Sequence, residues 1–335
     1  AIGQWIRKDG NLEGLQKVNE DFTKQVIGRS GKDNFTLDTD ATFIETEKEC
    51  AEMTYKGFTA FSSLLSFIAD LDLCVHDDYR NGAKHAGAGI EEQIISTHRL
   101  IKSLGKKLRY FRSDSAAYKA DVFNLCEDKK IIFTIAADQD KAVKEAIKAI
   151  PETAWKKLRD EQGKDTGREY AKTIHTMNKT KKAFTLIIQR WANKQPDLFE
   201  QEAWRHYVIA TNDYERNALD IIRFHNKRGN SENYNKEMKN GFAMEYAPSR
   251  VLKANGVYFR LGVLAYNLTI AVKQLFLGKD WIKKTVSTLR WQMIFVAGKV
   301  VRHGRKLYLK IAKDYFDLYT EIRRQIAQIP QAGFL

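Results

Sequence analysis

The stretch "FTLDTDATFIE", residues 35–45, decides the fold expected for this sequence. Its side chains alternate in character with a period of two, which predicts a β-strand with two different faces. One face carries Phe35, Leu37, Thr39, Ala41 and Phe43, and the other carries Thr36, Asp38, Asp40 and Thr42. A buried carboxylate is costly unless it is paired, hydrogen-bonded or bound to a metal ion. The two aspartates therefore indicate either a site in a central strand or the wet face of an edge strand.

Strands and helices alternate through residues 35–150. The residues that follow the first strand predict two more strands within 55–82, with a turn near 69–72. A Gly/Ala loop at 82–89 then leads into a helix. The remaining segments are expected as a helix at about 90–104, a strand and then a helix within 106–126, a strand at 129–138 and a helix at 139–150. This order favours a three-layer α/β arrangement.

The pattern changes after Pro151. Strand-like runs dominate from there to about 212, which predicts a β-rich insertion. The chain then becomes helical, with a long helix expected over 250–278. A basic, apolar stretch follows at 288–312, and an amphipathic helix is expected to end before Pro330.

Composition narrows the class of partner. Lys and Arg number 56 against 42 Asp and Glu, so the net charge of +14 favours an anionic partner, either nucleic acid or a membrane surface.

The longest apolar run, 261–272, is too short to span a bilayer and is expected to be a core helix. Three distant cysteines with no C-x-x-C pair argue against a zinc site or a disulfide framework and fit a reducing, intracellular setting. The sequence also contains no P-loop, G-x-S-x-G or H-E-x-x-H motif.

A second charged stretch, "HNKRGNSENYNKEMK" (225–239), has two interpretations. On one continuous helix, His225, Arg228, Glu232 and Lys239 would lie within an arc of roughly 60°. Alternatively a helix begins near Gly229, and Arg228 sits in the preceding turn. Taken alone, the stretch is typical of an amphipathic helix with a solvated Arg–Glu pair. A catalytic role for Glu232 requires other carboxylates to converge on it.

Asp114 is a candidate partner for Asp40 and Glu232. It lies where a strand is expected to end, and open α/β sheets place ligand sites at the carboxyl ends of strands. An N-cap for the next helix is the plain alternative. A strand aspartate, a strand-end aspartate and a helix glutamate together supply the hard oxygen ligands that two-metal phosphoryl transfer requires.

These blocks, in this order, resemble bacterial insertion-sequence transposases of the DDE type. The resemblance is to the branch with a Tyr-x2-Arg-x3-Glu-x6-Lys signature. Here every spacing is kept by His225, Arg228, Glu232 and Lys239, with His in place of Tyr. "LDTDAT" (37–42) resembles the first catalytic block and selects Asp40, and "RSDSAAY" (112–118) resembles the second and selects Asp114. "YRNGAKHAG" (79–87) resembles an Arg-x-Gly loop, and "FRLGVLAYNL" (259–268) resembles the helix after the signature.

The resemblance implies an α/β fold, with an RNase H-like mixed sheet flanked by helices, a β-rich insertion and a helical C-terminal part. It also implies an enzyme of cut-and-paste DNA transposition, an endonuclease that hydrolyses phosphodiesters at transposon ends and transfers strands. Asp40, Asp114 and Glu232 would hold two Mg²⁺ or Mn²⁺ ions, and Arg228 and Lys239 would contact phosphates. His225 could still donate a hydrogen bond to phosphate, with a charge that depends on pH.

Further expectations concern partners and cellular setting. Trp191 or Trp204 would stack on a flipped base, although a tryptophan in a strand is also an ordinary core residue. The partners would be double-stranded transposon ends and target DNA, bound by a homodimer on paired ends, with no membrane. The setting would be bacterial, cytoplasmic and nucleoid-associated. Two alternatives stay open: a catalytically silent DNA-binding protein derived from a transposase, and a nuclease on the same fold.

The same reasoning divides the chain into five parts. They are a linker or remnant of a DNA-end-binding region at 1–34, the first part of the RNase H-like core with Asp40 and Asp114 at 35–150, the β-rich insertion at 151–212, the second part of the core with the Glu232 helix at 213–278, and a C-terminal basic segment and helix at 279–335.

Overall fold

A single large mixed sheet organises the protein in the computed structural model, which describes residues 10–193 and 203–328. The strand order along the sheet is β2-β3-β1-β5-β6-β10-β9-β8-β7, and β4 also pairs with β3. The strands are β1 (Asn34–Glu45), β2 (Glu52–Met53), β3 (Thr59–Ile68), β4 (Leu73–Asn81), β5 (Lys107–Ser113), β6 (Ile132–Ala136), β7 (Lys156–Arg159), β8 (Asp165–His175), β9 (Phe184–Ala192) and β10 (Trp204–Thr211).

The strand bearing the two aspartates is central rather than at an edge. β1 pairs antiparallel with β3 on one side and parallel with β5 on the other, and β6 continues parallel beyond β5. β4 closes the other side, antiparallel to β3. This order of three antiparallel strands followed by two parallel ones is the RNase H-like arrangement, so the fold class predicted from the sequence is confirmed. Both edges of β1 are therefore paired, and most of its side chains are buried, so its polar side chains need partners.

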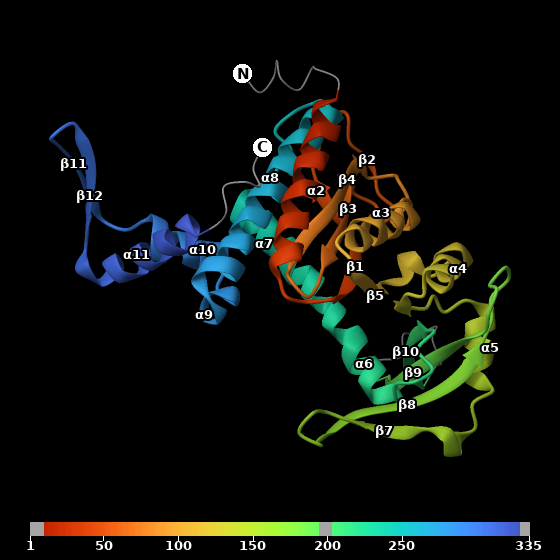
Figure 1. Ribbon diagram of the computed structural model, residues 1–335. Coiled ribbons are helices and arrows are strands. Elements are labelled where there is room, and N and C mark those ends of the chain that lie inside the picture. Colours follow the sequence, from red (N-terminus) through yellow and green to blue (C-terminus); the bar gives the residue numbers. More distant parts are fainter. Residues whose placement is uncertain (1–9, 194–202, 329–335) are drawn as a thin grey trace.

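Helices cover both faces of this core (Figure 1). They are α2 (Asn11–Arg29), α3 (Ile90–Ser103), α4 (Ala120–Lys129) and α8 (Leu252–Val272), whereas α5 (Lys141–Lys148) packs on β8 of the extension. α2 and α8 pack against each other and against β4, whereas α3 packs on β1 and β5. Buried amides tie this layer together, since Asn19 and Asn267 both donate to the Cys74 carbonyl. Within residues 10–193 and 203–328, no helix is long and apolar enough to cross a membrane.

The strands between residues 151 and 212 extend the same sheet. β10 pairs antiparallel with β6 of the core, and β9, β8 and β7 follow it outward. The segment expected as a β-rich insertion therefore consists of strands that continue the core sheet past its parallel edge. The five domain boundaries themselves stay a prediction.

The stretch that carries Arg228 and Glu232 is not one continuous helix. α6 (Ala218–Asn226) ends in a 3₁₀ turn at Lys227–Gly229, and α7 (Asn230–Phe242) begins directly after it. Arg228 therefore lies in the 3₁₀ turn before the Glu232 helix, as the second interpretation has it. The backbone nevertheless stays right-handed helical at Asn226, Gly229 and Asn230, so the chain continues from α6 into α7 without a break in direction of winding. Gly229 precedes α7 without a side-chain cap, and Ser231 instead donates its hydroxyl back to the Arg228 carbonyl.

The C-terminal part differs most from expectation. Short helices α9 (Lys279–Ile282) and α10 (Val286–Leu289) precede a hairpin of β11 (Gly298–His303) and β12 (Lys306–Ile311), and α11 (Lys313–Ala327) follows. The sequence indicated only a basic, apolar stretch at 288–312. Gly304 and Arg305 both adopt positive φ (57° and 62°), the geometry of a tight two-residue hairpin turn. The hairpin projects away from the main sheet (Figure 1).

Candidate active site

The two aspartates of β1 have different surroundings. Asp38 is fully buried and forms a two-pronged ion pair with Arg112 of β5, with Nε–Oδ1 and Nη2–Oδ2 distances of 2.6 and 2.7 Å. Parallel pairing of β1 and β5 places these two residues opposite each other. The same guanidinium lies over the ring of Phe224, which fixes its position. Asp38 is therefore a neutralised structural carboxylate, and Asp40 is the aspartate of β1 that remains for chemistry.

Asp40 lies in a concentration of negative charge. Its pKa is raised to about 6, first by burial and then by the nearby carboxylates of Asp114 and Glu232, while Arg228 acts in the opposite direction. The side-chain amide of Asn235 donates to Asp40 Oδ2 at 3.1 Å. The three carboxylates selected from the sequence are therefore close enough to influence one another. A cation would relieve their repulsion.

The sequence left two roles open for Asp114, a ligand at a strand end or an N-cap, and the structure allows both. It directly follows β5 and also caps the 3₁₀ turn Ser115–Ala117, accepting a hydrogen bond from the Ala116 amide at 3.1 Å. The cap fixes the direction of the carboxyl group relative to the end of the strand. A strand-end ligand position and an N-cap are thus the same feature here.

α7 presents three polar side chains toward β1, at spacings of three and four residues. Glu232 is exposed, Asn235 is buried and Lys239 is partly buried. Lys239 Nζ donates to the Phe43 carbonyl at 2.7 Å, so it joins the helix to β1. Burial lowers the pKa of Lys239, and the carboxylates of Glu245 and Asp40 oppose that shift.

His225 has internal partners in place of the phosphate contact considered from the sequence. It is 1% exposed, its Nδ1 contacts Thr134, and its Nε2 lies 2.8 Å from the Tyr207 hydroxyl. Burial, reinforced by Arg228, lowers its pKa to about 3, so the ring is neutral at physiological pH. Tyr207 in turn lies close to Arg228 and Asp114, both of which shift its pKa. His225 therefore positions a tyrosine hydroxyl of β10 at the edge of the site.

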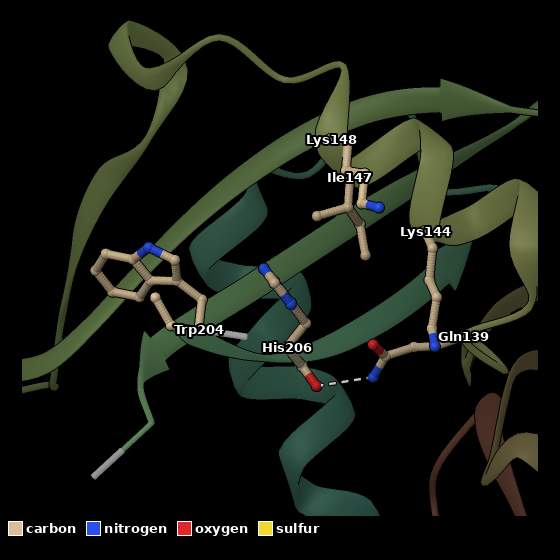
Figure 2. Close-up of a pocket in the computed structure, with 7 residues that line it drawn as sticks. Gln139, Lys144, Ile147, Lys148, Trp204 and His206 are labelled. Atoms are coloured by element: carbon tan, nitrogen blue, oxygen red, sulfur yellow. Dashed lines mark hydrogen bonds between the residues drawn. The ribbon is translucent and has the colours of Figure 1, made fainter. Parts of the chain in front are cut away.

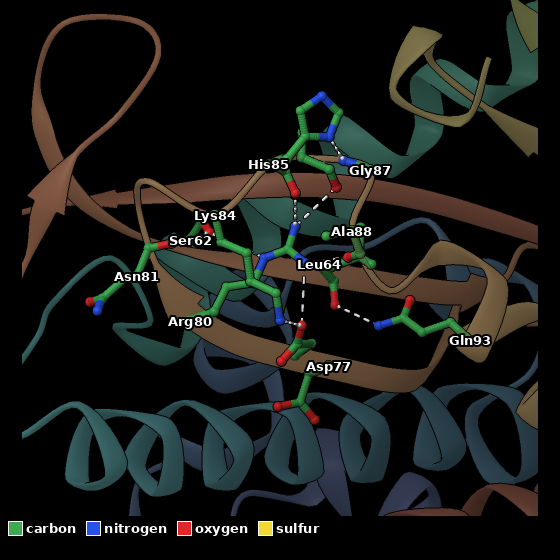
Figure 3. A network of polar contacts seen from close by, with 12 residues as sticks. Ser62, Leu64, Asp77, Arg80, Asn81, Lys84, His85, Gly87, Ala88 and Gln93 are labelled. Atoms are coloured by element: carbon green, nitrogen blue, oxygen red, sulfur yellow. Dashed lines mark hydrogen bonds and ion pairs between the residues drawn. The ribbon is translucent and has the colours of Figure 1, made fainter. Parts of the chain in front are cut away.

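The Gly/Ala loop before α3 is organised by one buried arginine. Arg80, 4% exposed, donates to the carbonyls of Ala88 (2.5 Å), Ala86 (2.9 Å) and His85 (3.3 Å). Figure 3 shows its guanidinium enclosed by these loop carbonyls. Three carbonyls on one cation hold the loop in a single conformation.

This loop in turn packs against the turn that carries Asp114. A Cβ atom on Gly87 would lie 2.1 Å from the Ala116 carbonyl oxygen, so only glycine fits there. Lys119 Nζ closes the contact from the other side by donating to the Gly87 carbonyl at 3.1 Å. Since Ala116 is the residue that Asp114 caps, the loop fixes the position of the Asp114 carboxyl group.

The two tryptophans proposed for base stacking lie on β9 and β10, the strands that continue the sheet past β6, and each has an arginine over one face. Arg168 lies 4.6 Å from the ring centroid of Trp191 and Arg190 lies 4.4 Å from that of Trp204. Trp204 is 37% exposed. It borders a pocket of about 180 Å³ that also contains Lys144, Lys148 and His206 (Figure 2). Trp204 thus combines an exposed ring with nearby lysines.

The donor set fits a hard divalent cation. Carboxylate oxygens are the ligands that Mg²⁺ and Mn²⁺ prefer, and a partly buried aspartate with two carboxylate neighbours is destabilised until a cation joins it. Across residues 10–193 and 203–328, no three His, Cys, Asp or Glu side chains are grouped closely enough to ligate one ion as they stand. Asp40, Asp114 and Glu232 therefore influence one another electrostatically, but their side chains would have to move closer together to bind one ion.

Two residues of this site were not identified from the sequence. Asn235 has a buried Oδ1 without a hydrogen-bond partner among the described residues, beside the Nδ2 that holds Asp40. Its spacing of three from Glu232 could have indicated a shared helix face. Tyr207 comes from β10, and only the tertiary fold brings it to His225. No sequence pattern indicates that contact.

One family of known proteins matches most of this chain. The family of transposase DDE domains, group 1, matches residues 4–332. No curated protein matches the chain. Among solved structures, the chain is similar to a piggyBac transposase seen in a synaptic complex with hairpin DNA, with 10% identity and a TM-score of 0.46 over 90% of this chain. It spans 55% of that protein's chain. Because the family match covers nearly the whole sequence, the chain belongs to the transposase DDE domain family, group 1.

Proposed function

We propose that this protein cleaves DNA at transposon ends and transfers the cleaved strands into target DNA, as a cut-and-paste transposase. The observation that carries the proposal is Asp40, whose pKa of about 6 reflects burial beside two further carboxylates. Such a group is poorly stable alone and well suited to binding cations. Cationic Arg228 and Lys239 beside it suit a phosphodiester substrate.

Asp40, Asp114 and Glu232 would hold two Mg²⁺ or Mn²⁺ ions. When bound, these ions would supply an activated attacking oxygen and stabilise the leaving oxygen of the phosphodiester. Asn235 orients the Asp40 carboxyl group through its hydrogen bond to Oδ2. Arg112 neutralises Asp38, so that the neighbouring aspartate does not compete for the same cations.

The remaining residues would bind and orient the DNA. Arg228, in the short turn before α7, presents a planar guanidinium that can hold two phosphate oxygens at once. Tyr207 donates its hydroxyl hydrogen to the neutral ring of His225 and lies beside Arg228, so it would help to hold that guanidinium in place. We propose Trp204 as the better candidate for stacking on an unpaired base, because its ring is exposed. Double-stranded ends, target DNA and a homodimer on paired ends complete the proposal, in the bacterial cytoplasm at the nucleoid.

Product analysis tests this function against its alternatives. The protein is incubated with Mg²⁺, DNA carrying the element's ends and a supercoiled target plasmid. Insertion of the ends into the plasmid is the expected result. Cut fragments without insertion would identify a nuclease on the same fold, and binding without any cleavage would identify a catalytically silent DNA-binding protein.

Replacing Asp40 by asparagine is expected to stabilise the metal-free protein at neutral pH. A folded-state pKa of about 6 against 3.8 unfolded means that the ionised carboxylate destabilises the fold above pH 6. The gain should be at most about 3 kcal/mol, at 1.36 kcal/mol per pKa unit. It should shrink as the pH falls from 6 toward 4, because the wild-type carboxyl group then takes up its proton.

Thermal unfolding of both proteins in chelator, at pH 7.5 and at pH 4.5, measures this difference. Comparing the two proteins at each pH cancels the contribution of His225, which is common to both. A stability difference that is absent, or that is the same at both pH values, would contradict the assigned environment of Asp40.

A further inference from the structure

A polar groove beside the site is lined by residues of α7, the end of α8 and the segment that carries the short helices α9 and α10. Figure 1 shows where these helices lie. Its volume is about 840 Å³. We call it the basic groove, because its cationic lining residues are Lys236, Lys273, Lys283, Lys284 and Arg290. Two carboxylates, Asp72 and Glu237, also line it.

Both carboxylates of the groove accept hydrogen bonds from residues that line it or adjoin it. Asp72 Oδ1 accepts the Tyr234 hydroxyl hydrogen bond at 2.5 Å, and Glu237 Oε1 accepts the backbone amide of Val286. The acidic groups therefore hold α7 against the neighbouring segments. The cations outnumber them, so the groove has a positive field.

The four lysines of the groove differ in their surroundings: two donate hydrogen bonds within the protein, and two are exposed. Lys273 is buried and donates to the Lys284 carbonyl, and Lys284 donates to Gln292 Oε1 at 2.7 Å. Lys236 and Lys283 are exposed on the rim. Buried Lys273 and half-buried Lys284 fix the shape of the groove, and the two rim lysines are placed to meet a ligand.

The neutral lining residues supply further polar groups. They are the amides of Asn230, Asn233 and Asn240 and the hydroxyls of Thr285 and Ser287. Lysine ammonium, amide and hydroxyl groups all donate hydrogen bonds to phosphate oxygens. A lining of this kind suits a run of phosphates better than a single small anion, because the donors are spread along the whole groove.

The position of the groove on α7 connects it to the candidate active site. Glu232 and Lys236 are one helical turn apart and so lie on neighbouring parts of the same surface. The site face of α7 (Glu232, Asn235 and Lys239) therefore adjoins the groove face (Asn233, Lys236 and Asn240). A DNA strand leaving Glu232 would enter the groove directly.

We propose that the basic groove binds the sugar–phosphate backbone of the DNA next to the cleaved bond, independently of base sequence. This inference rests on the proposed function and adds the path that the DNA takes. Contacts to phosphate alone hold the strand in register without reading it. They also make affinity depend steeply on salt, because each neutralised phosphate releases counterions.

The test compares wild type with a Lys236→Gln, Lys283→Gln double variant, using the full chain in chelator. Fluorescence anisotropy measures binding of mixed-sequence duplexes over a range of salt concentrations. Two lost phosphate contacts should reduce the slope of log K against log salt by about 2, at roughly 0.9 per contact. Affinity at low salt should fall by about tenfold or more, equally for duplexes of unrelated sequence.

The matched control is Lys102→Gln with Lys129→Gln. These exposed lysines of α3 and α4 remove the same charge elsewhere on the molecule. If both double variants lose the same slope, the effect is one of net charge and the groove proposal is overturned. An unchanged slope in the groove variant also overturns it.

Two further outcomes separate the possible failures. Wild type that nicks plasmid but shows no dependence on the rim lysines would refute the groove and leave the proposed function intact. Wild type that binds no DNA would refute both. A groove variant that loses binding to a polyglutamate peptide while keeping DNA affinity would assign the groove to an acidic protein segment instead.

Discussion

Asp114→Asn should lower the rate of Mg²⁺-dependent strand cleavage by about three orders of magnitude. Loss of a charged ligand removes cation binding at the strand end, and several kcal/mol of transition-state stabilisation correspond to such a factor. The asparagine oxygen can still accept the Ala116 amide hydrogen bond, so the turn should keep its shape. Conversion of supercoiled plasmid to nicked and linear forms, timed in Mg²⁺ and in Mn²⁺, measures the rate.

The matched control is Asp138→Asn. Asp138 is exposed and lies two residues after β6, the next parallel strand, so it has the same chemistry near a strand end. It is not among the carboxylates that raise the pKa of Asp40. Wild-type cleavage is expected from this variant. If Asp114→Asn cleaves as fast as wild type, Asp114 is only a cap and the assignment of the site fails.

Gly87→Ala should reduce cleavage by about 100-fold with little change in DNA affinity. The new methyl group would overlap the Ala116 carbonyl, which stands 2.1 Å from the Cβ position, so the Asp114 turn must move. A displacement of about 1 Å at a reacting group can cost a factor of that size. Plasmid cleavage, duplex binding and melting temperature should be measured together, because a positioning defect lowers the first and spares the second.

Gly28→Ala is the control for the glycine exchange. Gly28 lies within α2, and a Cβ there would meet nothing within 4 Å. Activity should be unchanged. If Gly87→Ala proves unfolded, Arg80→Lys tests the same loop, since lysine lacks the fork that holds the carbonyls of Ala86 and Ala88. Full activity in a folded Gly87→Ala protein would show that the loop does not position Asp114.

Local patterns in the sequence predicted the core elements well. The alternation around Asp38 and Asp40 predicted β1, and the order of strands and helices predicted a three-layer α/β arrangement. The RNase H-like fold was implied by the resemblance to DDE transposases. The pattern did not show which of the two aspartates is neutralised by an ion pair and which is available to bind a metal ion. Arg112, 74 residues away from Asp38, decides it through a parallel strand pairing. A register between distant strands has no local signal, so this ion pair could not be predicted.

Two features of the structure were not predicted, each for its own physical reason. The β11–β12 hairpin depends on two successive positive φ angles at Gly304 and Arg305, and arginine is not a typical residue for that turn. The contact between His225 and Tyr207 depends on β10 joining the core sheet. The position of His225 in the family signature suggested a phosphate contact, whereas the structure buries its ring against Thr134 and Tyr207.

Titration of Mn²⁺ into the metal-free protein by calorimetry tests the central claim most directly. Wild type, Asp40→Asn and Glu232→Gln are compared with Glu161→Gln, which removes an exposed carboxylate between β7 and β8. We predict saturable binding by wild type and by Glu161→Gln, and affinity lowered at least about tenfold in the two site variants. Wild type without saturable binding, or equal binding by all four proteins, would contradict the claim that these carboxylates form one metal-dependent active site.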